Sequence, residues 1–147
     1  MNTSISTLLA QKSRGIFTIP STVTVAAAVK EMNTQKVGSV LVMDGTKLAG
    51  IFTERDVLRR IVGANVDPQT TPITKVMTAD VLTVAPTATV QQVMDIFTEK
   101  RCRHLPVMDA GQLVGLVSIG DVSRWVANAH RAEAESLRQY ISGGLST

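Results

Sequence analysis

The sequence predicts an α/β fold of the α+β kind, with two tandem β-α-β-β-α repeats packed sheet to sheet with pseudo-two-fold symmetry. Three observations predict this fold. The phrase "GIFTERD" at residues 50–56 returns as "GLVSIGD" at residues 115–121. Moving the chain by 65 positions aligns residues 16–60 with residues 81–125 without a gap. Within each copy, short apolar runs alternate with apolar residues at helical spacing.

Each repeat is expected to begin with a strand and a helix. The β-rich runs "GIFTI" (15–19) and "VLTV" (81–84) are followed by turn residues and then by threonines typical of helix starts. Apolar residues at i, i+3, i+4 and i+7 predict one buried helix face in each repeat: Val25, Ala28, Val29 and Met32 in the first, and Val90, Val93, Met94 and Phe97 in the second.

A hairpin and a second helix complete each repeat. "GSVLVMD" and "RHLPVMD" are buried strand runs, and the turn signals Asp44-Gly45 and Asp109-Ala110-Gly111 lead from them into "KLAGIFT" and "QLVGLVS". Helical spacing then resumes, with Val57, Ile61 and Val62 in one repeat and Val122, Trp125 and Val126 in the other. We expect the last helix to continue into the tail and to stop at Gly143-Gly144.

The repeats set the predicted domain boundaries. Residues 1–65 form repeat 1 with an N-terminal segment, 66–80 a linker, 81–127 repeat 2, and 128–147 a helical tail. The linker assignment follows from two prolines and a run of polar residues. Within it, "ITKVM" can form one helical turn.

Composition excludes several classes of protein. At 147 residues and 44% hydrophobic, the chain can bury a core, and its single cysteine, Cys102, argues for a reducing compartment, with the cytosol as the expectation. No apolar run approaches the ~20 residues of a membrane span, and "MNTSISTLLAQKSRG" does not resemble an export signal. A net charge of +3 with 3% aromatic residues argues against nucleic acid as a partner.

Catalytic motifs are absent from the sequence. It contains no glycine-rich phosphate loop, no dinucleotide-binding glycine pattern and no Gly-x-Ser-x-Gly element. Cys102 and His104 lie two residues apart, but no third group that would orient them is evident. His104 and His130 are far apart and lack further ligands at metal-binding spacing. We therefore predict neither catalytic residues nor a metal site.

The repeated motifs resemble a pair of cystathionine-β-synthase (CBS) domains, an assembly often called a Bateman module. The resemblance rests on two β-α-β-β-α units, each closed by Gly, two apolar residues, Thr or Ser, two variable residues and Asp. "HLPVMD" on the middle strand and "MT" before the second copy add to it, and it extends from about Ile5 to Val126. The tail is similar to the end of stand-alone CBS pairs, which implies a regulatory protein that is not an enzyme.

Two hydroxyl–carboxylate pairs are the leading site candidates. Thr53 and Asp56, like Ser118 and Asp121, have the spacing of a capping box, so two ordinary helix caps are one interpretation. A helix start also favours phosphate, and a carboxylate beside it can accept two ribose hydroxyls. The CBS resemblance implies the second role as well, with the ligand in a cleft between the repeats.

Basic residues near these pairs are candidate phosphate ligands. Arg55 precedes Asp56 at a helix start, where a cation is unfavourable unless an anion lies nearby, although a solvated surface arginine is the alternative. Alternation along a strand would place Arg101 and Arg103 on one face and Cys102 and His104 on the other. The resemblance implies ligand contacts for Arg103 and His104, and for the matching Gly38 and Ser39 of repeat 1.

The resemblance also implies a set of residues around the adenine base. The matching positions in this sequence are Ile16, Thr18, Val40, Thr83, Leu105 and Pro106. Ordinary core packing is the alternative for these residues, above all for Val40 and Leu105.

Two functions follow as alternatives. The first is a regulatory module that binds an adenine nucleotide and signals to an unknown partner by a conformational change; AMP is the first candidate, then ADP, ATP or a dinucleotide such as NAD, with S-adenosylmethionine also open. The second is a structural module with no ligand, whose role is dimerisation. A homodimer through the repeat helices is expected in either case, because Leu58, Trp125, Leu137 and Tyr140 exceed what one interior helix face needs.

Overall fold

The computed structural model describes residues 2–12 and 15–145 and confirms a mixed α/β fold with two small sheets. The chain forms two compact units that do not follow the repeat order. Unit 1 comprises Met1–Lys12, Pro86–His104 and Val117–Thr147, and unit 2 comprises Ser13–Ala85 and Leu105–Leu116. The hairpin of repeat 2 therefore contributes most of its length to the unit that holds repeat 1.

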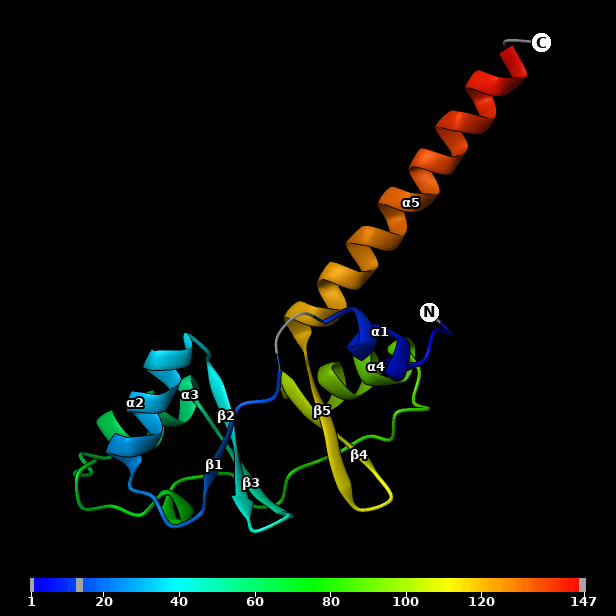
Figure 1. Cartoon of the computed structure of the whole chain (residues 1–147). Coiled ribbons are helices and arrows are strands. Elements are labelled where there is room, and N and C mark those ends of the chain that lie inside the picture. The colour runs from blue at the N-terminus through cyan, green and yellow to red at the C-terminus, as the bar shows by residue number, and fades with distance from the viewer. Residues whose placement is uncertain (1, 13–14, 146–147) are drawn as a thin grey trace. The chain divides into compact units, whose positions relative to one another are not determined.

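Unit 2 contains a three-stranded sheet in the order β1-β2-β3 (Figure 1). β1 (Thr18–Pro20) pairs in parallel with β2 (Ser39–Asp44), which pairs antiparallel with β3 (Lys47–Thr53). The helix α2 (Val25–Gln35) connects β1 to β2. The pairing is parallel because this helix returns the chain to the end of the sheet at which β1 began.

The predicted helix face of repeat 1 is confirmed. Thr24 caps α2 by accepting a hydrogen bond from the Ala27 N–H, and Lys36 ends the helix in the left-handed conformation at φ 56°. The core of unit 2 combines this face with β1 to β3 and with segments further along the chain: Ile19, Val25, Ala28, Met32, Val40, Val42, Phe52, Ile61, Ile73 and Val76.

The second helix of repeat 1 differs from the predicted α-helix. α3 covers only Glu54–Asp56, and the chain continues as the π-helix η1 (Val57–Val62). Hydrogen bonds to the fifth preceding residue, such as Gly63 N–H to Leu58 O at 2.8 Å, shift the side-chain register from that of an α-helix. As a result Ile61 is buried, whereas Val62, which the predicted helical spacing grouped with it, is 69% exposed.

The predicted linker packs against repeat 1. The short 3₁₀ helix η2 (Ile73–Lys75) provides the expected helical turn, and Ile73 and Val76 are buried. Thr78 exchanges backbone hydrogen bonds with Ile51 on β3. A Cβ at Gly50 would lie 2.6 Å from the Thr78 carbonyl oxygen, so this glycine permits the linker to approach the strand.

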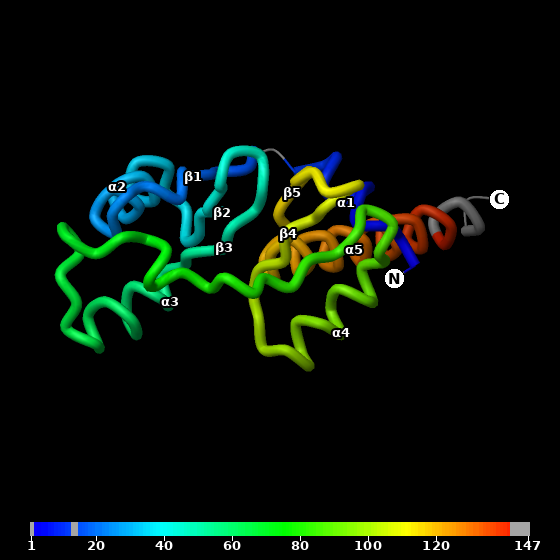
Figure 2. Tube along the Cα trace, turned by 90° about the horizontal axis from the view of Figure 1, so that it is seen from below, coloured from blue at the N-terminus to red at the C-terminus, as the bar shows by residue number. Residues whose placement is uncertain are grey.

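Unit 1 is built around three helices: α1 (Ile5–Gln11), α4 (Val90–Lys100) and α5 (Ile119–Leu145) (Figure 2). The buried α4 face of Val90, Val93 and Phe97 is as predicted. Helix α1 is an element that the sequence analysis did not predict; its Ile5 and Leu8 are buried. Its start is fixed to the α4 segment by Ile5 N–H to Ala88 O at 2.7 Å and by Val90 N–H to Thr3 O at 2.9 Å.

Two further expectations for repeat 2 need correction. The run "VLTV" contributes only an isolated parallel bridge, between Val84 and Val107, because only Val84 of these described residues exchanges backbone hydrogen bonds with β4, at 3.0 Å to the Pro106 carbonyl and 2.9 Å from the Met108 N–H. Helix α5 continues past Gly143-Gly144 to Leu145, since glycine weakens a helix without forbidding it. The hairpin itself forms as predicted, with β4 (His104–Asp109) paired to β5 (Gln112–Ser118).

Backbone geometry repeats with the sequence. Lys36 and Arg101, 65 positions apart, both end a helix in the left-handed conformation, at φ 56° and φ 52°. Gly45 and Ala110 occupy the matching hairpin turns at φ 61° and φ 51°. The two repeats therefore share turns and caps as well as apolar spacing.

Candidate functional site

The first candidate pair lies where β3 ends and α3 begins. The Asp56 carboxylate oxygen Oδ2 accepts hydrogen bonds from the Thr53 N–H at 2.9 Å and from the Thr53 hydroxyl at 3.2 Å. In return, the Thr53 Oγ1 accepts from the Asp56 N–H at 3.4 Å. This arrangement is a capping box, and it holds the Asp56 side chain against the helix start. Only 11% of that side chain is exposed.

The second candidate pair repeats this arrangement where β5 meets α5. Asp121 Oδ2 accepts from the Ser118 N–H at 2.9 Å, and Ser118 Oγ accepts from the Asp121 N–H at 3.1 Å. The capping interpretation of both pairs is therefore present in the structure. Capping leaves the second carboxylate oxygen, Oδ1, unused by the cap in each case, so it does not exclude a ligand.

Two cations engage Asp121 directly. The Lys12 ammonium, at the end of the N-terminal segment, donates to Oδ2 at 2.9 Å, and the Arg124 guanidinium donates to Oδ1 at 2.6 Å. Burial raises the pKa of the Asp121 carboxyl, but the hydrogen bonds from Lys12 and Ser118 and the Lys12 charge outweigh it, so that pKa lies below its usual value. Asp121 is thus held in its ionised form.

Asp56 has a weaker cationic partner. The Arg60 Nε lies 3.6 Å from Asp56 Oδ1, while the Arg60 Nη1 donates to the carbonyl oxygens of Val76 and Met77 at 2.9 and 3.0 Å. Arg60 is therefore bound mainly to the linker. Among the residues that the structure describes, no other cation lies within ion-pair distance of Asp56.

One backbone hydrogen bond frames each pair. In repeat 1 the Glu54 N–H donates to the Gly38 carbonyl at 3.0 Å, and in repeat 2 the Ile119 N–H donates to the Arg103 carbonyl at 3.0 Å. These bonds bring the start of the middle strand beside the start of the helix. Gly38 and Arg103 thereby lie next to the capping pairs.

An acidic residue, Glu54, lies beside the first pair. A Cβ on Gly38 would lie 3.2 Å from the carboxyl carbon of Glu54, whereas repeat 2 has Ile119 at the Glu54 position. Ser39 is buried at 7% exposure, and Arg55 is exposed on α3. No described contact joins Arg55 to the Asp56 carboxylate.

The strand predicted for residues 101–104 is absent before His104, although exposure alternates along these residues. Arg101 is the left-handed C-cap of α4, and β4 begins only at His104, so the four residues do not alternate across a strand. Arg103 is nevertheless exposed, and Cys102 and His104 are half-buried.

The residues expected around an adenine base fall into two groups. Val40 and Leu105 have no exposed surface, and Pro106 is also buried, so core packing accounts for all three. Thr18 and Thr83 are exposed, and Ile16 is 37% exposed. Of the predicted set, these three have side-chain surface that a ligand can contact.

Sequence reasoning missed Lys12 and Arg124. Arg124 lies one helical turn after Asp121 and aligns with Arg59, which is a usable signal. For Lys12 the available signal was the helical spacing of Ile5, Leu8 and Leu9 just before it. That spacing predicts a helix, but not the side chain that the helix presents to Asp121.

The described residues offer little for metal binding or membrane insertion. Within residues 2–12 and 15–145, no group of three or more His, Cys, Asp or Glu side chains is arranged to hold a metal ion. None of the helices in that part of the chain has the length and apolar character to cross a membrane. Burial raises the pKa of the Cys102 thiol above its usual value, which disfavours the thiolate.

Comparison with protein families gives a clear match. A family model described as the CBS domain matches the chain twice, over residues 12–63 and 73–128. The mitochondrial CBS domain-containing protein CBSX3 of Arabidopsis thaliana is 40% identical over 126 residues, which are 82% of this chain and 61% of that protein. The chain therefore spans less than two thirds of that relative.

Solved structures agree with this match. A protein with CBS domains from Burkholderia ambifaria superposes with a TM-score of 0.80 at 39% identity, covering 84% of this chain and 93% of the other. A CBS domain protein from Pyrobaculum aerophilum, complexed with AMP, has a TM-score of 0.73 at 25% identity, covering 81% and 89%.

Proposed function

The chain belongs to the CBS domain family, and from this premise we propose that it is a regulatory module that binds an adenine nucleotide through Asp56 and Asp121. AMP is the first candidate ligand, ahead of ADP, ATP, NAD and S-adenosylmethionine. One observation carries the proposal: the same nearly buried carboxylate is held at the same helix start in both repeats. A pre-oriented carboxylate of this kind suits the vicinal hydroxyls of a ribose.

Two further observations support the proposal. The Pyrobaculum protein was solved as an AMP complex, which shows that a relative of the same fold accommodates that nucleotide. Each carboxylate has exposed or half-buried polar residues near it: Thr53 and Arg55 beside Asp56, and Arg103, His104 and Ser118 beside Asp121. We include Thr18, Gly38, Ser39 and Thr83 as further proposed contacts.

A thermal-shift screen tests the proposal. Selective binding to the folded state raises the apparent melting temperature by mass action, so AMP, ADP, ATP, NAD and S-adenosylmethionine are compared at equal concentration. We expect a rise with at least one of them that adenine-free phosphates do not produce. No shift with any of the five up to millimolar concentration would favour the structural module without a ligand.

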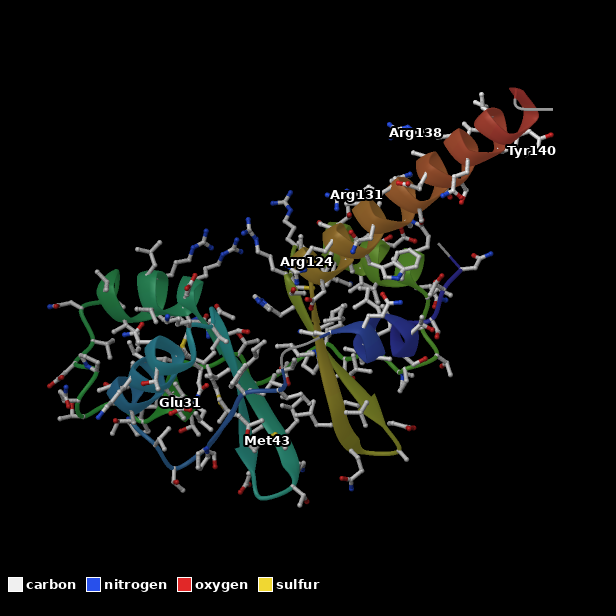
Figure 3. The ribbon with its side chains drawn as sticks, turned by 45° about the horizontal axis from the view of Figure 1, so that its top comes forward. Glu31, Met43, Arg124, Arg131, Arg138 and Tyr140 are labelled. Atoms are coloured by element: carbon white, nitrogen blue, oxygen red, sulfur yellow. The ribbon has the colours of Figure 1, made fainter. Side chains whose placement is uncertain are left out.

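We also propose a homodimer through the helices. Leu58 and Val62 on η1 are 66% and 69% exposed, and Leu137, Tyr140 and Ile141 on the last part of α5 are 60%, 80% and 51% exposed. α5 extends beyond α1 and α4 within unit 1 (Figure 1). Figure 3 shows Arg131 and Arg138 along one side of α5 and Tyr140 on the other, so basic residues and an exposed aromatic residue lie on different faces of this helix.

Light scattering measures this association. The chain mass is 15.7 kDa, and a dimer has twice that value. Leu58→Glu and Leu137→Glu each charge one exposed patch without disturbing the core, and the variant that yields a monomer identifies the interface. Trp125 is half-buried, so Trp125→Glu would confound folding with association. A monomeric parent at micromolar concentration would refute the dimer.

The proposal also extends to a regulated partner and to a cellular compartment. We propose that the signal passes to a separate protein, because the described chain presents no catalytic constellation of its own. A cytosolic location remains a prediction, and one relative is described as mitochondrial.

A further inference from the structure

The Asp121 carboxylate is already engaged by donors from the protein itself. Oδ2 accepts from the Ser118 N–H and from the Lys12 ammonium, both at 2.9 Å. Oδ1 accepts from Arg124 at 2.6 Å. A carboxylate oxygen offers about two lone-pair sites, so Oδ2 is fully occupied. A ribose that uses both oxygens of Asp121 must therefore take the place of one of the two donors to Oδ2.

Of the two donors to Oδ2, Lys12 is the one that can move. The Ser118 N–H is fixed in the backbone at the end of β5, whereas the Lys12 ammonium is carried on four methylenes and the side chain is 23% exposed. Moving the ammonium away from a buried carboxylate costs free energy. A ligand with hydroxyl groups alone does not offset that cost, but a ligand that also brings a phosphate gives the ammonium a new anionic partner.

Resting on the nucleotide site proposed above, we infer that Lys12 makes the Asp121 site selective for phosphorylated ligands over nucleosides. The ammonium leaves Oδ2 when a ribose hydroxyl occupies that position, and it binds the phosphate of the same ligand. Lys12 is thus a competitor of the ribose and a partner of the phosphate. Adenosine must therefore displace Lys12 from Oδ2 without offering it a phosphate, whereas AMP displaces Lys12 and also binds it through the phosphate.

The Asp56 site has no described lysine in a comparable ion pair. Its nearest described cation is Arg60 at 3.6 Å from Oδ1, and the Arg60 guanidinium is bound to two linker carbonyls. A ribose therefore reaches Asp56 without displacing a close ion pair. We expect this site to discriminate less strongly between AMP and adenosine.

Calorimetric titration with AMP and adenosine tests the inference. An Asp56→Asn chain isolates the Asp121 site, and Lys12→Met is introduced into it because methionine keeps most of the lysine stem but removes the charge. We expect AMP to bind more weakly and adenosine more tightly. The dissociation constant for adenosine divided by that for AMP should therefore fall by roughly tenfold or more. Lys12→Arg should keep most of the preference.

Matched controls separate selectivity from stability. Lys47→Met removes an exposed lysine on β3 and should leave the ratio unchanged. If Lys12 has a purely structural role, Lys12→Met reduces the fraction of the protein that is competent to bind. Binding of AMP and of adenosine is then weakened by the same factor, and the ratio of their dissociation constants is preserved. That result would overturn the inference and leave the proposed function intact. Binding of neither AMP nor adenosine by the parent at millimolar concentration would overturn both.

Discussion

Asp56 and Asp121 occupy the same place in the two repeats, but their electrostatic surroundings differ. Both accept a backbone N–H at 2.9 Å inside a capping arrangement. Asp121 in addition forms ion pairs with Lys12 at 2.9 Å and Arg124 at 2.6 Å, whereas Asp56 faces Arg60 at 3.6 Å. Ion pairs therefore add to the cap in fixing the Asp121 carboxylate, whereas the Asp56 carboxylate is fixed mainly by its cap.

The difference arises outside the repeated phrase. In repeat 2 an α-helix follows Asp121, and Arg124 at i+3 lies over the carboxylate. In repeat 1 a π-helix follows Asp56, and the cation nearest to that carboxylate is Arg60 at i+4. Duplicated motifs can thus keep their backbone while neighbouring segments set different charges around them.

The largest expected effect is on stability. We expect Asp121→Ala to lower the free energy of unfolding by about 2–3 kcal/mol, because it removes the carboxylate that forms ion pairs with Lys12 and Arg124 and also removes a cap. Asp56→Ala should cost only about 1–2 kcal/mol, chiefly through the cap. Urea denaturation of the two variants measures the difference, and equal losses would contradict the contrast drawn here.

The pH dependence sharpens the same contrast. Because the folded-state pKa of Asp121 is lowered, its contribution is present above its unfolded-state pKa of about 3.9 and is lost as the pH falls through the folded value. The stability gap between the parent and Asp121→Asn should therefore stay constant from pH 7 to about 5 and narrow below about 4. A gap that closes near neutral pH would show that another group titrates.

The hairpin turns provide the smallest effect. Gly45 and Ala110 both have positive φ, a conformation that favours glycine, so the repeats differ in local strain. We expect Ala110→Gly to stabilise the chain by about 0.5–1 kcal/mol and Gly45→Ala to destabilise it by about 1 kcal/mol. Thermal unfolding of both variants provides the comparison, and a change of the same sign in both would be inconsistent with this interpretation.

Local patterns predicted the local structure well. The buried faces of α2 and α4 and the two hairpins follow from apolar spacing and turn residues that interact within a few positions. The capping pairs Thr53–Asp56 and Ser118–Asp121 were predictable for the same reason. Such features depend on short-range geometry that one repeat contains in full.

Features that depend on distant segments were not predictable. Lys12 reaches Asp121 across 109 positions, and no periodicity in either segment encodes that pairing. The π-helix η1 was also missed, because its residues have the apolar spacing of an α-helix, and that spacing does not reveal hydrogen bonds to the fifth preceding residue. The roles of Arg103 and His104 toward a ligand remain predictions from the family resemblance, and that of Arg55 remains a prediction from its place at a helix start.

Calorimetric titration of the unaltered chain with AMP tests the central claim most directly, with Asp56→Asn and Asp121→Asn titrated in parallel. The account predicts two binding events of unequal affinity, because Lys12 and Arg124 surround only one of the carboxylates. Each substitution should remove a different one of the two events. Absence of binding at millimolar AMP, or two equal sites that neither substitution alters, would contradict it.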